Sequence, residues 1–202
     1  MGLCGINAFC IRAVAAMVDD MATRTLTPAV AALAGDISAI VRQDQPAIDT
    51  ARLVADAVGR QLGTPGMLTD EQQEHDDACY RQHVLYVDPE GLFSIVSLVW
   101  MPGQETVIHD HVTWCVVGVH QGNEEETLYR LVDNGLEPEH LVQSGHSLNG
   151  EGTTSYFVPP GDIHKVCNSS DRKVISIHVY GTDIAARGNS VRRRYDLPIK
   201  TR

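Results

Sequence analysis

Two histidines separated by a single residue lie in the stretch HDHVTWCVVG, which runs from His109 to Gly118. Cys115 follows four residues after the second histidine, His111. Alternate residues of a β-strand share one face, so we expect His109, His111, Thr113 and Cys115 to share a face of a single strand. Imidazoles placed in this way can reach one metal ion, and they suit iron, copper, nickel and zinc. Taken alone, the pattern is equally explained by two solvent-facing histidines on an edge strand.

A third histidine follows a tight turn in a separate segment. The run PPGDIH places rigid proline and glycine residues directly before His164. Such a turn fixes where the next strand begins, and so where its histidine points. Asn168, four residues later, is predicted to be a turn residue. The histidines of the two segments, His109, His111 and His164, therefore predict a metal site.

The spacing of these residues resembles the two motifs of the cupin superfamily. Gly103, five residues, His109, one, His111, three, Cys115, six, Gly122 resembles the first motif. Pro159-x-Gly161-x-x-His164-x-x-x-Asn168 resembles the second. This similarity implies a mainly β fold, a small β-barrel or jelly roll with the metal inside it.

One departure from the cupin pattern bears on the chemistry. Cys115 stands where the superfamily usually has a glutamate ligand. Three neutral histidines would leave a divalent ion its full charge and some open positions. The site would then favour an anionic substrate such as a thiolate.

A third segment narrows the resemblance. In VISIHVYG, Ser176, His178 and Tyr180 alternate with aliphatic residues. An amphipathic strand with its polar face in solvent would explain this row by itself. Together with the three histidines and Cys115, the row resembles the thiol dioxygenases, namely cysteine dioxygenase and 3-mercaptopropionate dioxygenase. The similarity extends from about Tyr80 to Tyr180.

This resemblance implies an oxidoreductase that binds Fe(II) through His109, His111 and His164. Such an enzyme adds both atoms of O2 to the sulfur of a small thiol and produces a sulfinic acid. The substrate would be of the cysteine or 3-mercaptopropionate type.

The resemblance also assigns roles around the iron. Tyr180 would steer bound oxygen or substrate, His178 would orient Tyr180, and Ser176 would orient His178. Cys115 and Tyr180 match the pair that forms a thioether cross-link in cysteine dioxygenases. The alternative for Cys115 is a buried and inert thiol.

Substrate recognition departs from the animal-type pattern, in which an early arginine holds the substrate carboxylate. Gln82, within YRQHVLYVD, occupies that position, and the adjacent Arg81 is expected to point the other way. Glutamine donates a hydrogen bond but lacks the charge of a guanidinium. This form resembles 3-mercaptopropionate dioxygenases, in which a later arginine takes over, with Arg187 and Arg193 as candidates. A larger thiol such as ergothioneine would also fit a pocket without the early arginine.

Two other classes of function stay open at this stage. One is a non-redox zinc or nickel cupin that acts as an isomerase or hydrolase, although it gives no role to Cys115 with Tyr180. The other is a cupin that binds a small ligand without reaction. The metal that is bound and the fate of the ligand distinguish the three classes.

The elements that must position these residues divide the chain in two. Residues 1–75 are predicted to form an N-terminal leader and a helical support region. Its apolar residues recur at intervals of three and four between Thr27 and Leu62, and LTDEQQEH adds a short turn. Residues 76–202 contain short runs rich in Val, Ile, Tyr and Phe between turn residues, which predicts the cupin β-barrel.

Composition limits the partners. The formal net charge of −10 argues against nucleic acid, and no run approaches the roughly 20 apolar residues of a membrane helix. The five scattered cysteines favour a reducing cytoplasm, and the N-terminus lacks the basic start of a signal peptide. We expect a monomer or weak homo-oligomer. At least two residues of the basic cluster Arg192, Arg193 and Arg194 are expected in a solvated tail.

Overall fold

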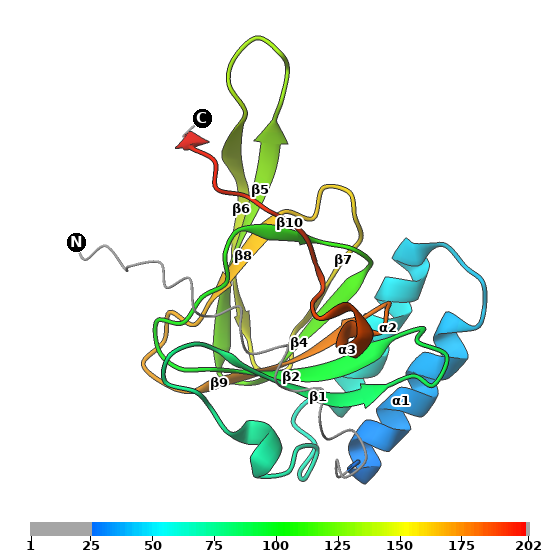
Figure 1. The fold of residues 1–202 in the computed structure, drawn as a ribbon. Helices are drawn as coiled ribbons and strands as arrows, with labels where there is room; N and C mark the ends of the chain where they lie inside the picture. Colours follow the sequence, from blue (N-terminus) through cyan, green and yellow to red (C-terminus); the bar gives the residue numbers. More distant parts are fainter. Residues whose placement is uncertain (1–25, 201–202) are drawn as a thin grey trace.

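The computed structural model describes residues 26–200, in which two β-sheets face each other and two helices cover the outer side of one sheet (Figure 1). This confirms the predicted mainly β fold with a helical region ahead of it. The predicted leader lies largely outside the described residues, and the division into residues 1–75 and 76–202 stays a prediction. Between residues 26 and 200, no helix has the length and apolar character needed to cross a bilayer.

The helical region begins and ends where its sequence indicates. Helix α1 (Pro28–Val41) starts after Thr27, whose Oγ1 accepts a hydrogen bond from the Val30 amide at 3.3 Å. Pro28 occupies the first helical position, where its missing N–H costs nothing. Helix α2 (Ala47–Gln61) and a short 3₁₀ turn, η2 (Glu71–Gln73), complete the region.

Eleven strands and one short helix follow. The first sheet contains, in spatial order, β1 (Arg81–Val87), β2 (Ser94–Trp100), β9 (Val174–Tyr180), β4 (Cys115–Gln121) and β7 (Thr154–Phe157). The second contains β10 (Val191–Arg194), β3 (His109–His111), β8 (His164–Cys167), β5 (Asn123–Val132), β6 (His140–Gly150) and β11 (Ile199–Lys200). Helix α3 (Ile184–Arg187) lies between β9 and β10 in the chain.

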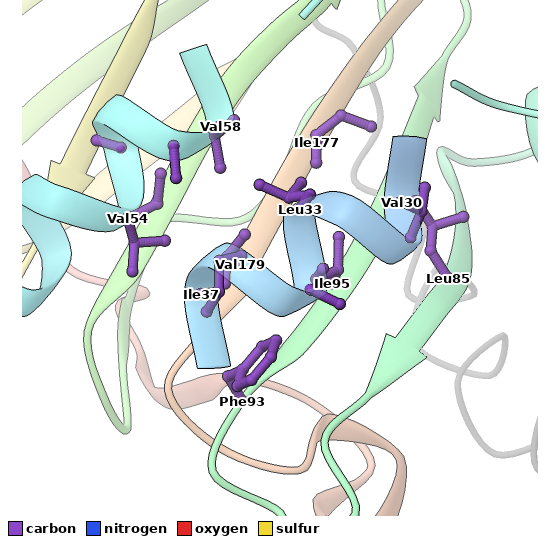
Figure 2. Packing of buried hydrophobic residues seen from close by; sticks show 14 of the residues in the cluster. Val30, Leu33, Ile37, Val54, Val58, Leu85, Phe93, Ile95, Ile177 and Val179 are labelled. Atoms are coloured by element: carbon purple, nitrogen blue, oxygen red, sulfur yellow. The ribbon is translucent and has the colours of Figure 1, made fainter. Parts of the chain in front are cut away.

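The helices and the outer face of the first sheet share one hydrophobic core (Figure 2). Leu33 and Ile37 of α1 are fully buried against Ile177 and other residues of the sheet. Helix α2 approaches β4 so closely that a Cβ on Gly118 would lie 2.6 Å from Cγ1 of Val58. The helical layer therefore fixes the sheet from outside.

The inner face of the same sheet carries the polar chemistry. In β9, Ile175, Ile177 and Val179 pack toward the helices, so the alternating residues between them face the barrel interior. All seven residues of β9 are buried. A solvent-facing polar row at Ser176, His178 and Tyr180 is thereby excluded.

The expectation of one continuous strand from His109 to Cys115 is wrong. The chain leaves the second sheet after β3 and enters the first at β4, so His111 and Cys115 lie on strands of different sheets. The crossing is fixed by Trp114, whose carbonyl accepts from the Gly181 amide at 3.1 Å. A Cβ on Gly181 would meet the Trp114 ring at 2.3 Å, so only glycine permits this close approach.

The side chains of the basic cluster are exposed to solvent, as expected, but the cluster does not lie in a tail. Arg192, Arg193 and Arg194 belong to β10, which pairs with β3 and covers its edge. The carboxylate of Asp110 on β3 is fully buried and pairs with the guanidinium of Arg192. A buried carboxylate needs such partners, and this requirement ties β10 to β3.

Strand β6 is not one of the short runs rich in Val, Ile, Tyr and Phe that predict the barrel. Its sequence HLVQSGHSLNG is mostly polar after the first three residues, and only those three are buried in the sheet. It pairs along its length with β5, and the two extend away from the barrel as a long hairpin (Figure 1). Backbone pairing with β5, rather than side-chain burial, stabilises most of this strand. Its sequence therefore lacks the hydrophobic alternation by which a strand is predicted.

We expect Leu33→Ala to lower the free energy of unfolding by about 2–5 kcal/mol, because it leaves a cavity between α1 and the sheet. Leu33 is 0% exposed, whereas Leu136 is 90% exposed and provides the matched control. Urea denaturation of both variants measures the difference. Equal midpoints for the two variants would contradict a shared core.

Candidate metal centre

Three histidines converge inside the barrel. Strand β3 supplies His109 and His111, and β8 supplies His164, which lies directly opposite His109 in the antiparallel pair. One ligand nitrogen from each ring lies within 4.8 Å of the other two. The structure thus brings together the three residues that the sequence predicts as ligands.

Each ring is oriented through its Nδ1 atom. The Nδ1 of His109 lies 2.9 Å from the carbonyl oxygen of Val107. The Nδ1 of His111 lies 3.0 Å from Oδ2 of Asp162, and that of His164 lies 2.6 Å from Oε1 of Glu126. The Val107 carbonyl and the Asp162 carboxylate only accept, so Nδ1 of His109 and Nδ1 of His111 carry a proton and each Nε2 presents a lone pair. Burial raises the pKa of Glu126 to about 7, so above that pH its carboxylate imposes the same tautomer on His164.

Burial keeps the rings of His109 and His164 neutral. Burial, followed by the neighbouring His111, lowers the pKa of His164 to about 3. Burial also lowers the pKa of His109 well below its usual value, with His164 and His111 adding to the effect. The Nε2 of His164 is buried without a hydrogen-bond partner. Three buried imidazoles whose ligand nitrogens converge fit a metal ion of the type that His₃ sites bind.

A hydrogen-bonded chain lies beside this cluster on β9. The Ser176 hydroxyl is 3.0 Å from Nε2 of His178, and the Tyr180 hydroxyl is 3.2 Å from Nδ1 of the same ring. Trp100 donates from its indole N–H to Ser176 at 3.1 Å. Burial raises the pKa of Tyr180 well above its usual value, so its phenol stays protonated. This hydrogen-bonded row of side chains therefore runs from Trp100 to the neutral phenol of Tyr180.

Cys115 and Tyr180 lie opposite each other on β4 and β9. Both belong to the same buried cluster, and directly opposed side chains on paired strands lie in contact distance. Burial raises the pKa of the Cys115 thiol well above its usual value. The Cys115 sulfur does not belong to the group of converging ligand atoms, so the candidate metal site consists of the three histidines.

A cavity of about 110 Å³ connects the histidine cluster to the surface. Its walls include His109, His111 and His164, together with His178 and Tyr180. The volume is well below the roughly 300–1,000 Å³ of pockets for drug-sized ligands, so the cavity suits a small molecule.

The cavity also shows which polar residues meet a ligand. Gln82 lines it, while Arg81 turns away to pair with Glu74 at 3.1 Å. Arg187 and Arg193 are not among its lining residues, and Arg193 instead pairs with Glu139 at 3.1 Å. The remaining histidines of the described chain lie outside the cluster, namely His75, His83, His120, His140 and His146.

Several residues of the site were not predicted. Arg194 lines the cavity, although its position in a run of three arginines resembles a solvated cluster. Glu126 orients His164 and belongs to the run EEE, which also resembles a solvated surface. Asp162 was visible as part of the PPGDIH turn, but its role became apparent only from its contact with His111.

Fold and site together define a cupin with a three-histidine centre in its barrel. Within this superfamily the chain belongs to the cysteine dioxygenase type I family, whose sequence profile matches residues 68–186. This confirms the resemblance to the thiol dioxygenases.

Individual relatives match part of the chain. Human cysteine dioxygenase type 1 is 29% identical over 92 residues, which cover 45% of this chain and 45% of the human protein. The cysteine dioxygenase type 1 of Danio rerio is 30% identical over 96 residues, with the same coverage of 45% of each chain. The chain thus spans less than half the length of the curated relatives it matches.

Solved structures to which the chain is similar have lower identity. A cupin superfamily protein from Desulfitobacterium hafniense is 11% identical, with a TM-score of 0.42 over 60% of this chain and 90% of that one. A double-stranded β-helix protein from Klebsiella pneumoniae is 20% identical, with a TM-score of 0.42 over 57% of this chain and 88% of that one.

We expect Glu126→Gln to weaken metal binding by about 10–100-fold, because it removes the charged acceptor that orients His164. Glu125→Gln is the matched control, because the Glu125 side chain lies on the opposite face of β5 and pairs with His146 at 2.8 Å. Titration with Fe(II) under anaerobic conditions measures both affinities. Unchanged affinity in Glu126→Gln would contradict this role.

Proposed function

We propose that the protein is an Fe(II)-dependent thiol dioxygenase that converts a small thiol to its sulfinic acid. The observation that carries the proposal is one cavity that joins three buried, converging imidazoles to the Ser176–His178–Tyr180 chain. Membership of the cysteine dioxygenase type I family supports the same reaction.

His109, His111 and His164 would hold the iron through their Nε2 atoms. Bound Fe(II) would supply the redox chemistry that activates O2, which zinc cannot supply because it does not change oxidation state. The protein's own contribution is to bury and orient the three rings, and to enclose the reaction in a buried cavity. With no carboxylate among the ligands, the centre attracts a thiolate.

Arg194 is the best candidate to bind the acidic group of the substrate. It is exposed at the cavity wall, and no ion pair from residues 26–200 engages its guanidinium. Arg192 and Arg193 on the same strand instead pair with Asp110 and Glu139. Gln82 also lines the cavity and would add a neutral hydrogen bond. Arg194 thereby takes the role that the sequence assigned to Arg187 or Arg193.

The substrate we propose is a small carboxylated thiol of the cysteine or 3-mercaptopropionate type. The cavity of about 110 Å³ favours it over a larger thiol such as ergothioneine. An uncharged Gln82 beside Arg194 favours 3-mercaptopropionate, because neither residue offers a carboxylate for the ammonium group of cysteine.

Tyr180 would act directly on the reacting groups. Its phenol lines the cavity and stays protonated, so it can donate a hydrogen bond to an oxygen or sulfur atom there. His178 and Ser176 would act through Tyr180 by fixing the direction of its hydroxyl.

A thioether between Cys115 and Tyr180 stays a prediction that the opposed positions of these residues support. It would join Sγ to a ring carbon of Tyr180 with loss of two hydrogen atoms, and O2 would accept the two electrons and two protons. Intact mass spectrometry after aerobic turnover should show the loss of two hydrogens in the wild type and not in Cys115→Ala. An unchanged mass would leave Cys115 as a buried packing residue.

We place the protein in a reducing compartment such as the cytoplasm, as a monomer or weak homo-oligomer without nucleic-acid partners. Within residues 26–200, Cys79, Cys115 and Cys167 form no disulfide, which fits such a compartment.

The first test is O2 uptake by Fe(II)-loaded protein offered 3-mercaptopropionate, cysteine, cysteamine or ergothioneine. We expect one O2 consumed per thiol, and a product that carries two added oxygen atoms by mass spectrometry. Activity with zinc or nickel but not iron would indicate the isomerase or hydrolase class. Recovery of an unchanged, bound ligand would indicate a binding protein.

Arg194→Ala should raise the KM for the carboxylated thiol by about 10–100-fold, the equivalent of one charged hydrogen-bond pair. The KM for cysteamine, which has no carboxylate, should change little. Arg193→Ala is the matched control, because it removes the neighbouring guanidinium outside the cavity. Equal KM values for Arg194→Ala and the control would contradict the assignment.

A further inference from the structure

The edge strand β10 contains a β-bulge beside the histidine cluster. Three pairs of opposed residues define its register against β3, namely Val191 with His111, Arg193 with Asp110, and Arg194 with His109. Between the first two pairs β10 advances by two residues while β3 advances by one, so Arg192 is the additional residue. A bulge changes the direction of the side chains that follow it, and here it acts on a run of three arginines.

The bulge determines which arginine reaches the cavity. Residues opposite each other on paired strands point to the same face of the sheet, so Arg194 faces inward with His109 and lines the cavity. In a regular ladder the inward positions after Val191 would fall on every second residue. Arg193 would then face inward and Arg194 outward. The additional residue, Arg192, thus exchanges Arg193 for Arg194 at the cavity wall.

The carboxylate of Asp110 holds this bulge. Its Oδ1 atom accepts a hydrogen bond from the backbone N–H of Arg193 at 2.9 Å, and its Oδ2 atom accepts from the Tyr195 hydroxyl at 2.7 Å. The Oδ2 atom also pairs with the guanidinium of Arg192. These partners lie on both sides of Arg194 in the chain. Asp110 is 0% exposed, so a change of register that removed its partners would leave a buried charge unpaired, which is costly.

Asp110 acts from the face of the sheet that is turned away from the cavity. Its neighbours His109 and His111 point into the barrel, and alternation along the strand directs Asp110 the other way. Asp110, Arg192 and Tyr195 line a separate groove, and none of the three lines the cavity of the histidine cluster. Asp110 can therefore affect a ligand in that cavity only through the chain of β10.

We propose that Asp110 is a positioning residue that holds the bulge and thereby selects Arg194, and not Arg193, to bind the acidic group of the substrate. This inference rests on the proposed function, in which Arg194 binds a carboxylated thiol. The three residues of β3 then have two roles. The inward histidines face the metal site, and the outward carboxylate sets the position of the substrate-binding arginine on the neighbouring strand.

Anaerobic binding of two thiols to the Fe(II)-loaded protein tests this role without turnover. 3-Mercaptopropionate has a carboxylate and cysteamine has none, so only the first should depend on the position of Arg194. We expect Asp110→Ala to weaken binding of 3-mercaptopropionate by about 10–100-fold, as Arg194→Ala does, because each loses one charged hydrogen-bond pair to the substrate. Binding of cysteamine should change little. Calorimetry measures both affinities, and a general structural defect would weaken both alike.

The double variant Asp110→Ala with Arg194→Ala shows whether Asp110 acts through Arg194. Once Arg194 has left the cavity, its removal should have no further effect, so the double variant should bind 3-mercaptopropionate about as weakly as Asp110→Ala alone. Glu139→Ala is the matched control. It removes a carboxylate that pairs with the side chain of Arg193 at 3.1 Å and does not contact the backbone of the bulge. This control should bind both thiols as the wild type does.

Amide hydrogen exchange in the wild-type protein is a second measurement that needs no variant. The Arg193 amide donates to the buried Asp110 carboxylate, and the Tyr195 amide donates to the Ile108 carbonyl at 2.9 Å. We expect the Arg193 amide to exchange as slowly as the Tyr195 amide, followed by NMR of the protein loaded with diamagnetic zinc. Fast exchange at Arg193 would overturn the proposal even where Asp110→Ala does not fold.

The binding results separate this proposal from the proposed function. Unchanged affinity of Asp110→Ala for 3-mercaptopropionate would overturn the proposal, as would equal losses for the two thiols or additive losses in the double variant. Absence of O2 uptake with every thiol would reject the dioxygenase and leave the affinities to decide the role of Asp110. Unchanged affinity of Arg194→Ala would reject Arg194 as the substrate-binding residue, and this inference with it.

Discussion

The structure depends on holding three buried imidazoles so that they point at one place inside a barrel. Two charged rings about 5 Å apart would repel strongly in a buried site. The protein prevents this by burial, and by giving each Nδ1 an oxygen acceptor from a different part of the chain. Val107, Asp162 and Glu126 thus act on the rings from outside the cluster.

This constraint explains features that lie far from the cavity. Strand β3 has only three residues and carries two of the histidines, so it needs support from both sides. Strand β8 pairs with it on one side, and β10 covers the other, held by the buried carboxylate of Asp110. The helices stabilise the opposite sheet from outside, which leaves its inner face free for polar residues. A buried polar chain on β9 is tolerated because every member of it is hydrogen-bonded.

The two strands that supply polar groups to the interior have complementary roles. Strand β9 carries the hydrogen-bonded side chains that end at Tyr180. Strand β5 carries two buried carboxyl groups, those of Glu124 and Glu126. Glu126 orients a histidine of the cluster, and Glu124, two residues earlier, is also buried. Because alternate residues of a strand share a face, both carboxyl groups enter the barrel while Glu125 between them faces outward. One short run of glutamates thus supplies two buried carboxyl groups, of which Glu126 contacts the histidine cluster.

The sequence by itself determined the elements and the identity of the central residues. Helix signals such as Thr27–Pro28 are local, and strands with apolar runs are recognisable from composition, so both were predicted. The histidines were predictable because motif spacing reflects a local geometry that the backbone repeats wherever the fold occurs. The same holds for the Ser176–His178–Tyr180 row, whose period of two residues follows from the strand itself.

The tertiary structure decided what depends on contacts between distant segments. The break between His111 and Cys115 follows from the contact of Trp114 with Gly181, which no local pattern encodes. The choice among Arg192, Arg193 and Arg194 depends on which carboxylates the fold places beside them, and that leaves Arg194 facing the cavity. In the sequence, Glu124 and Glu126 resemble part of a solvated acidic run, but both are buried in the folded barrel. Burial and hydrogen-bond partners are properties of the assembled structure, and these properties give a charged side chain its function.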